Sequence, residues 1–180
     1  MATVTTPNPF SKQDIAVSHF VDAVNNLNEI KILSNDGFIT NPNFGALIRT
    51  IDVDSGLTGG PYDIFGLAPS RTEDDKLWVG VRNNGTGSHY FRKFNTDTGD
   101  IEITIAITKG LGANQLDFPA DITVDSDDNL YTIDLSILSL FSVSSAGTVR
   151  AHNWKPSIPA SGTVSMTDPC LEYNEDRDTV

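Results

Sequence analysis

The alternation of apolar and polar residues predicts mostly β-strands from residue 30 onward. Short apolar runs such as EIKIL and ALIRTIDV are separated by stretches rich in Gly, Asn, Asp and Ser. Short runs of apolar and β-branched residues bounded by these turn-forming residues are typical of strands joined by tight turns. The sequence therefore predicts an all-β domain over residues 30–180.

The segment before this domain has a different pattern. Residues 1–10 are rich in Thr, Pro and Asn, and the two prolines exclude a helix, so we expect an extended arm. Ser11 and Asp14 have the spacing of a capping box, and the apolar residues that follow recur at helical spacing, which predicts an amphipathic helix over residues 12–28. The arm and helix form an N-terminal unit, residues 1–29, whose apolar face covers either its own domain or a partner. The candidate partner-binding residues are Phe10, Val17, Phe20, Val21, Val24 and Leu27.

Two segments of the β domain resemble each other. Residues 61–107 begin with PYDI and residues 119–154 begin with PADI. In each, an acidic turn leads to a strand that starts with Leu and an aromatic residue, and two further strands flank a turn containing Gly. Four strands joined by tight turns are typical of a β-propeller blade. Partial blades are expected at either end, the last one beginning in DPCLEYNEDRDTV.

The pattern P-x-D-I, D-S-D-D-N-L-Y-T-I-D, F-S-x-x-G resembles the repeats of NHL-type and SMP-30-like propellers. The resemblance covers residues 46–180 and is strongest over residues 119–152. It implies a ring of four-stranded blades that usually serves binding. Some SMP-30-like propellers are calcium-dependent lactonases or esterases with the metal in the central channel. That alternative implies a role for Asp63, Asp121 and Asp168, which recur at the blade starts; otherwise these residues cap loops.

Two complete blades are too few to close a ring, because propellers usually have at least four. Three interpretations stay open. The chain is the N-terminal part of a longer protein, it completes its sheets with another subunit, or it is an open β-sandwich with similar hairpins. We favour the first interpretation.

The stretch DITVDSDDNLYTID places oxygen-bearing side chains at Asp125, Asp127 and Asn129, as a calcium loop does. An EF-hand loop needs Gly at its sixth position and Glu at its twelfth, but Leu130 and Ser136 stand there. Asp and Asn are also common in tight turns, because their side chains bond nearby backbone. We therefore expect a hairpin turn here, with a calcium site as the alternative and no other cofactor.

The sequence contains no motif of a known catalytic site. It lacks the G-x-S-x-G, H-E-x-x-H, P-loop and dinucleotide signatures. His19, His89 and His152 lie in unrelated contexts, and Cys170 is the only cysteine. Trp78, Tyr131 and Trp154 form a ligand face or, as we prefer for the first two, pack between blades.

Composition narrows the choice of partner. The net charge is −12 and the pI is about 4.4, which argues against nucleic acid and anionic membrane surfaces. The N-terminus lacks the features of a signal peptide, and no apolar run reaches transmembrane length, so we expect cytoplasmic synthesis. We predict a non-enzymatic structural or binding module that docks onto other subunits of an assembly. Its layout is similar to tail or fibre proteins of phage particles; the alternatives are a metal-dependent propeller hydrolase and a carbohydrate-binding adhesin.

Overall fold

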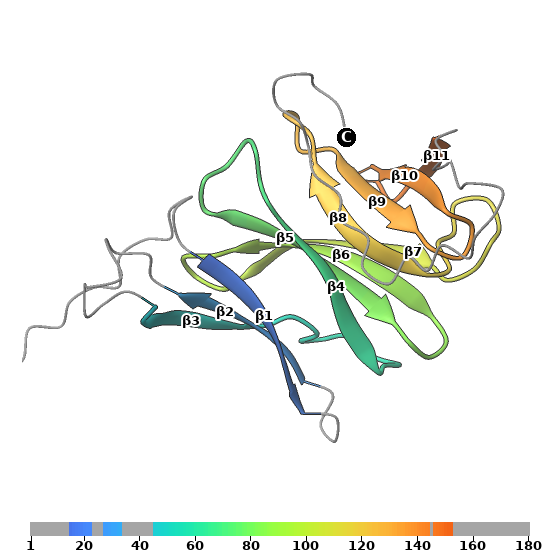
Figure 1. The fold of residues 1–180 in the computed structure, drawn as a ribbon. Coiled ribbons are helices and arrows are strands. Elements are labelled where there is room, and N and C mark those ends of the chain that lie inside the picture. Colours follow the sequence, from blue (N-terminus) through green and yellow to red (C-terminus); the bar gives the residue numbers. More distant parts are fainter. Residues whose placement is uncertain (1–14, 23–26, 34–44, 145, 153–180) are drawn as a thin grey trace, which may run out of the picture.

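The computed structural model describes residues 15–22, 27–33, 45–144 and 146–152, with side chains from Asn28 onward. The described residues contain eleven strands and no helix (Figure 1). They form one three-stranded and two four-stranded sheets, all antiparallel. The first sheet has the order β1-β2-β3 and consists of β1 (Ile15–Asp22), β2 (Leu27–Leu33) and β3 (Leu47–Asp52).

The two four-stranded sheets follow in sequence, and each runs from its first strand to its last without a crossover. Their strands span residues 62–108 and 119–152, where the repeat indicates the ranges 61–107 and 119–154. The prediction of an all-β chain of four-stranded, blade-like sheets is therefore confirmed, and the described sheets do not close a ring. The second sheet consists of β4 (Tyr62–Pro69), β5 (Lys76–Asn83), β6 (Ser88–Asn95) and β7 (Ile101–Thr108). The third consists of β8 (Pro119–Val124), β9 (Leu130–Asp134), β10 (Ser139–Val143) and β11 (Val149–His152).

The helix predicted over residues 12–28 is wrong where the structure describes it. β1 occupies Ile15–Asp22 and pairs with β2, so its backbone groups are bonded across strands. Ile15, Val17 and Val21 satisfy the two-residue period of a strand as well as helical spacing. Because β-branched side chains favour strands, the β interpretation prevails. The expected domain boundary at residues 29 and 30 falls inside β2.

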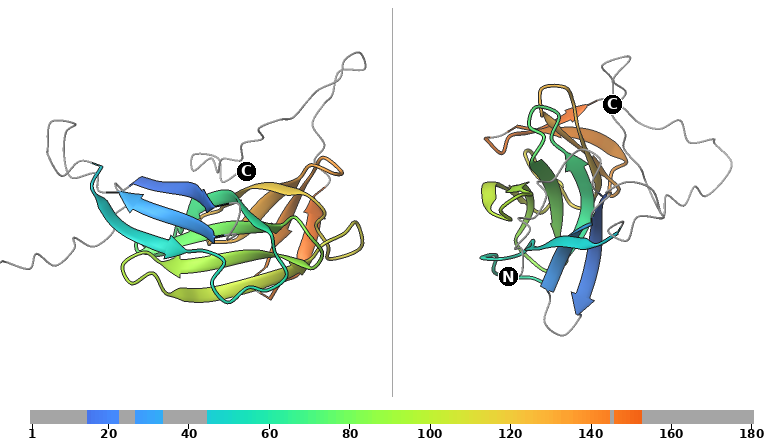
Figure 2. Two further views of the ribbon diagram at one scale, coloured as in Figure 1. Left: turned by 90° about the horizontal axis from the view of Figure 1, so that it is seen from below. Right: turned by 90° about the vertical axis from the view of Figure 1, so that its left-hand side faces the viewer.

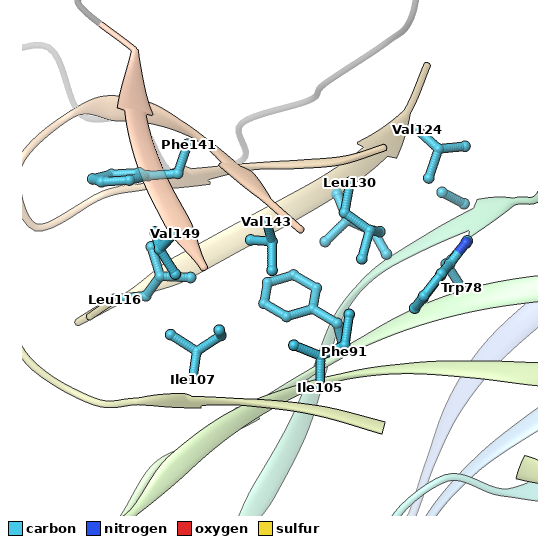
Figure 3. Packing of buried hydrophobic residues seen from close by; sticks show 12 residues of the cluster. Trp78, Phe91, Ile105, Ile107, Leu116, Val124, Leu130, Phe141, Val143 and Val149 are labelled. Carbon is cyan, nitrogen blue, oxygen red and sulfur yellow. The ribbon is translucent and has the colours of Figure 1, made fainter. Parts of the chain in front are cut away.

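The three sheets follow one another in space (Figure 2). Two hydrophobic cores lie between them. One core lies between the first and second sheets and includes Ile32, Val79 and Phe94. The other lies between the second and third sheets and includes Trp78, Phe91, Phe141 and Val149 (Figure 3). Each sheet thus buries an apolar face against its neighbour, as consecutive blades do.

The first strands of the two four-stranded sheets, β4 and β8, pass very close to each other. A Cβ placed on Gly66 in β4 would lie 2.7 Å from the Ile122 nitrogen of β8 and 3.0 Å from Asp121 Oδ1. Only a residue without a side chain permits this approach of backbones.

Candidate functional site

A pocket of about 380 Å³ opens between the third sheet and the connection from β7 to β8. Its floor is formed by apolar side chains of β10 and β11, namely Phe141, Val149 and Ala151. Its opposite wall is formed by residues 110–115. The volume and the mainly apolar lining are those of a binding site for a side chain or a small ligand.

The connection that forms this wall is held in one conformation by hydrogen bonds. Gly110 N–H donates to the Leu116 carbonyl at 2.9 Å, and Leu116 N–H donates to the Thr108 carbonyl at 3.2 Å. Gly112 N–H donates to Gln115 Oε1 at 2.8 Å. The wall is therefore in place before any ligand arrives, which lowers the entropic cost of binding.

Asp134, at the end of β9, is the acidic side chain of the pocket lining, and it is almost fully buried. Asp117 N–H and Phe118 N–H donate to its Oδ2 at 2.6 and 3.2 Å, and Ser136 N–H donates to its Oδ1 at 2.9 Å. Its carboxylate holds the β7–β8 connection against the turn after β9. The Asp134 carboxylate thus adds negative charge to the pocket lining, and both of its oxygens already accept hydrogen bonds from backbone N–H groups.

Large apolar side chains are exposed at the rim. Leu111 is 68% and Ile137 is 43% exposed, and both line the pocket. Phe118, on the same connection, is 42% exposed and lies against the Arg82 guanidinium at 4.1 Å. Exposed apolar groups gathered around a concave site are typical of a surface that contacts another protein.

The stretch predicted to be either a turn or a calcium loop is a hairpin turn between β8 and β9. Asp125 N–H bonds to the Asn129 carbonyl at 3.1 Å. The Asp125 carboxylate accepts bonds from Asp127 N–H, from Asn129 N–H and side-chain amide, and from the Tyr131 hydroxyl. The turn prediction is confirmed, because Asp125 serves the turn itself. In the part of the chain that the structure describes, no group of three His, Cys, Asp or Glu side chains has the geometry of a metal site.

Asp128, in the same turn, connects the two four-stranded sheets. Its Oδ2 accepts bonds from Ser70 Oγ at 2.6 Å, Lys93 Nζ at 3.0 Å and Trp78 Nε1 at 3.4 Å, and its Oδ1 accepts a bond from Arg71 N–H at 2.6 Å. Burial opposes the ionisation of Asp128, but the bonds from Ser70, Arg71 and Lys93 outweigh it, so the pKa of this carboxyl lies below its usual range. Nothing in the local sequence distinguishes Asp128 from the other acidic residues of this turn.

The acids at the two described blade starts have different surroundings. Asp63 forms an ion pair with Arg82 of β5 at 3.3 Å and accepts a bond from the side-chain amide of Asn84, which directly follows β5. Asp121 Oδ1 accepts a bond from Ile122 N–H at 2.8 Å. Both acids lie within strands: Asp63 is in β4 beside its cross-strand partner Arg82, and Asp121 is in β8. Asp168 lies outside the described residues.

The candidate partner-binding residues fall partly outside the described chain. Val17, Phe20 and Val21 lie in β1 and Leu27 begins β2, with only their backbones described. The positions outside the described residues are Phe10 and Val24. Their role in binding stays a prediction.

The remaining sequence candidates differ in their surroundings where they are described. Trp78 is buried in the core between the second and third sheets, as expected. Tyr131 is half-buried, with its ring 5.8 Å from that of His152.

His89 is fully buried, its Nδ1 accepts a bond from Asn83 N–H at 3.1 Å, and burial lowers its pKa. Trp154 and Cys170 lie outside the described residues, and the described part contains no helix that could cross a membrane.

A comparison with one solved structure supports the fold. No family model and no curated protein matches the chain. Among solved structures, a protein of unknown function from Bacteroides caccae aligns over 79% of this chain with a TM-score of 0.52 and 9% identity. A gluconolactonase from Xanthomonas campestris aligns over 72% with a TM-score of 0.45 and 20% identity. The chain spans 42% and 36% of these proteins, and the likeness to the Bacteroides protein concerns the fold alone.

Proposed function

We propose that the chain is a non-enzymatic binding module that docks onto a partner protein in a larger assembly through the pocket of the third sheet. The observation that carries this proposal is the combination of an apolar pocket with the exposed rim of Leu111 and Ile137. A partner side chain that enters the pocket removes apolar surface from water on both molecules. Such burial contributes about 25 cal/mol per Å² before the costs of association.

The polar lining favours binding over catalysis. A general acid or base exchanges a proton with its substrate, and bonds accepted from backbone N–H groups leave a carboxylate fewer lone pairs for that role. Asp134 accepts three backbone bonds, and Gln115 Oε1 accepts one. These groups shape the site by holding its wall. The metal-dependent hydrolase and the carbohydrate-binding adhesin stay alternatives, and membership of a virus particle stays a prediction from the layout of the chain.

Filling the pocket tests the proposal. Ala151→Trp places a large ring in the pocket, because Ala151 lines it. Arg150→Trp is the matched control: Arg150 is the exposed neighbour on β11, outside the pocket lining, and adjacent strand residues point to opposite faces. Peptides are selected from a random display library on the wild-type chain, and their affinities are measured for all three proteins by calorimetry.

We expect the selected peptides to bind wild type and Arg150→Trp alike, and to bind Ala151→Trp at least roughly tenfold more weakly. Equal binding to the filled pocket would show that the site lies elsewhere. Failure to select any binder would count against a binding module. Hydrolysis of lactone or ester substrates by the purified chain, with or without added calcium, would contradict the non-enzymatic assignment.

A further inference from the structure

The two four-stranded sheets can be compared residue by residue, because their registers correspond. Leu77 of β5 pairs with Phe94 of β6, and Leu130 of β9 pairs with Val143 of β10. Each pair is buried on the face that packs against the preceding sheet. The residue two positions before Phe94 is Arg92, and the residue two positions before Val143 is Phe141. Arg92 and Phe141 therefore occupy corresponding places.

At the junction of the first and second sheets, Arg92 binds the connection between β3 and β4. Its Nη1 donates to the Val53 carbonyl, and its Nη2 donates to the Ser55 carbonyl at 3.0 Å. Its Nε donates to Thr104 Oγ1 at 3.3 Å on the neighbouring strand. Only 5% of Arg92 is exposed. A buried guanidinium thus fills this junction and ties the connection to the sheet behind it.

The β7–β8 connection has the corresponding carbonyls. Val53 and Lys109 each directly follow the last strand of a sheet, and each donates its N–H across that sheet to a backbone carbonyl. Counting from these two residues, Leu111 corresponds to Ser55. The Lys109 and Leu111 carbonyls therefore correspond to those that Arg92 binds at the preceding junction, and Leu111 lines the pocket.

The pocket lies where the preceding junction holds the arginine. Phe141 has no hydrogen-bond donor, so the bonds that Arg92 makes have no counterpart from this position. Its partner across the strand pair is Ala151, whereas Arg92 pairs with the larger Thr104. These exchanges leave space between the sheet and the connection, and that space is the pocket.

The charge and the aromatic lining of the pocket also suit a cation. The Asp134 carboxylate belongs to the lining, and the whole chain carries a net charge of −12. The Phe141 ring offers an aromatic face, to which guanidinium groups bind favourably. At the first junction, the Arg92 guanidinium likewise lies 5.7 Å from the centre of the Phe94 ring.

We propose that the group that enters the pocket is an arginine side chain of the partner protein, taking the place that Arg92 holds at the preceding junction. Its aliphatic stem lies against Val149 and Ala151, and its guanidinium donates to the carbonyls of the β7–β8 connection. This inference rests on the proposed docking function and adds the chemistry of the docked group.

The test uses three small probes: the N-acetyl amides of arginine, lysine and leucine. Each is titrated into the isotope-labelled 180-residue chain, and amide shifts of Gly110, Gly112 and Ala151 are followed by NMR. We expect the arginine probe to bind roughly tenfold more tightly than the leucine probe, because hydrogen bonds to charged groups add to apolar contact. The lysine probe should bind less tightly than the arginine probe, because an ammonium lacks the planar fork. Added salt should weaken arginine binding.

Substitutions of pocket residues test whether the arginine probe binds inside the pocket. Phe141→Arg should fill the pocket from within and abolish binding of the arginine probe. Ala151→Trp gives the same readout should Phe141→Arg fail to fold, and Arg150→Trp should bind the probe like wild type. Preference for leucine would overturn the arginine inference and leave the docking function standing. Shifts that persist in the folded filled variants would overturn the inference as well. If none of the probes binds while library peptides still require an open pocket, the inference fails; if those peptides fail too, so does the docking function.

Discussion

Asp128 holds the second and third sheets together, and replacing it by alanine should destabilise the protein strongly. Its side chain is 11% exposed and that of Lys93 is 7% exposed, so the two charges meet largely away from water. Breaking a buried charge pair by removing one partner costs about 3–5 kcal/mol. Lys93 keeps an ion pair with Glu73, which is 46% exposed, so we place the cost at about 3 kcal/mol. For a chain of this length that lowers Tm by roughly 6–12 °C.

The assay is urea unfolding at neutral pH, with Asp127→Ala as the matched control. Asp127 is the exposed neighbour in the same turn, so its loss should change the free energy of unfolding by less than about 0.5 kcal/mol. The pKa of Asp128 is depressed in the folded state, so its stabilisation is present above its ordinary pKa of 3.8 and is lost as the pH falls through the lower folded value. The deficit of Asp128→Ala should therefore shrink in strong acid. A deficit no larger than that of Asp127→Ala would refute the assignment of Asp128 as the link between the sheets.

Two further predictions follow from buried positions. Burial lowers the pKa of His89 below 6.5, and the charged groups that face it are Lys109 and Asp134. As the pH falls, this histidine therefore takes up a proton in the unfolded chain before it does so in the folded protein. Stability should drop below about pH 6.5, and His89→Gln should flatten that slope; an unchanged slope in urea titrations would assign it to other groups. Gly66→Ala should cost about 1–3 kcal/mol, because its methyl group meets the Ile122 backbone of the next sheet. A decrease in Tm of less than 1 °C in Gly66→Ala would show that β4 and β8 can move apart without a loss of stability.

The four-stranded sheets were predictable because their signals are local. Each strand is short, apolar and bounded by residues that favour turns, and the Asp125 turn bonds within itself. The N-terminal helix was wrong because Val17 and Val21 fit both periods, and pairing with β2 decided between them. Where two patterns fit the same residues, the choice depends on contacts that the local sequence does not contain.

Asp128 and the pocket could not be predicted for a related reason. The partners of Asp128 lie far away in sequence: Lys93 is 35 residues away and Ser70 is 58. The pocket depends on the difference between Arg92 and Phe141, which is meaningful only once the strand registers show that they correspond. Counted from the Leu-aromatic positions, Arg92 follows Leu77 by 15 residues and Phe141 follows Leu130 by 11, so an ungapped alignment of the two repeats does not match them.

The contacts of Arg92 have a consequence for how tightly a partner can bind. Arg92 belongs to the same chain as the carbonyls that it binds, so it meets them at a high effective concentration and loses little freedom in doing so. A side chain on another molecule that makes the same bonds must also offset the loss of translational and rotational freedom. One inserted group therefore gives only weak, rapidly reversible association. Durable attachment requires the partner to engage Leu111, Ile137 and further surface at the same time, so avidity rather than the pocket alone decides whether the complex persists.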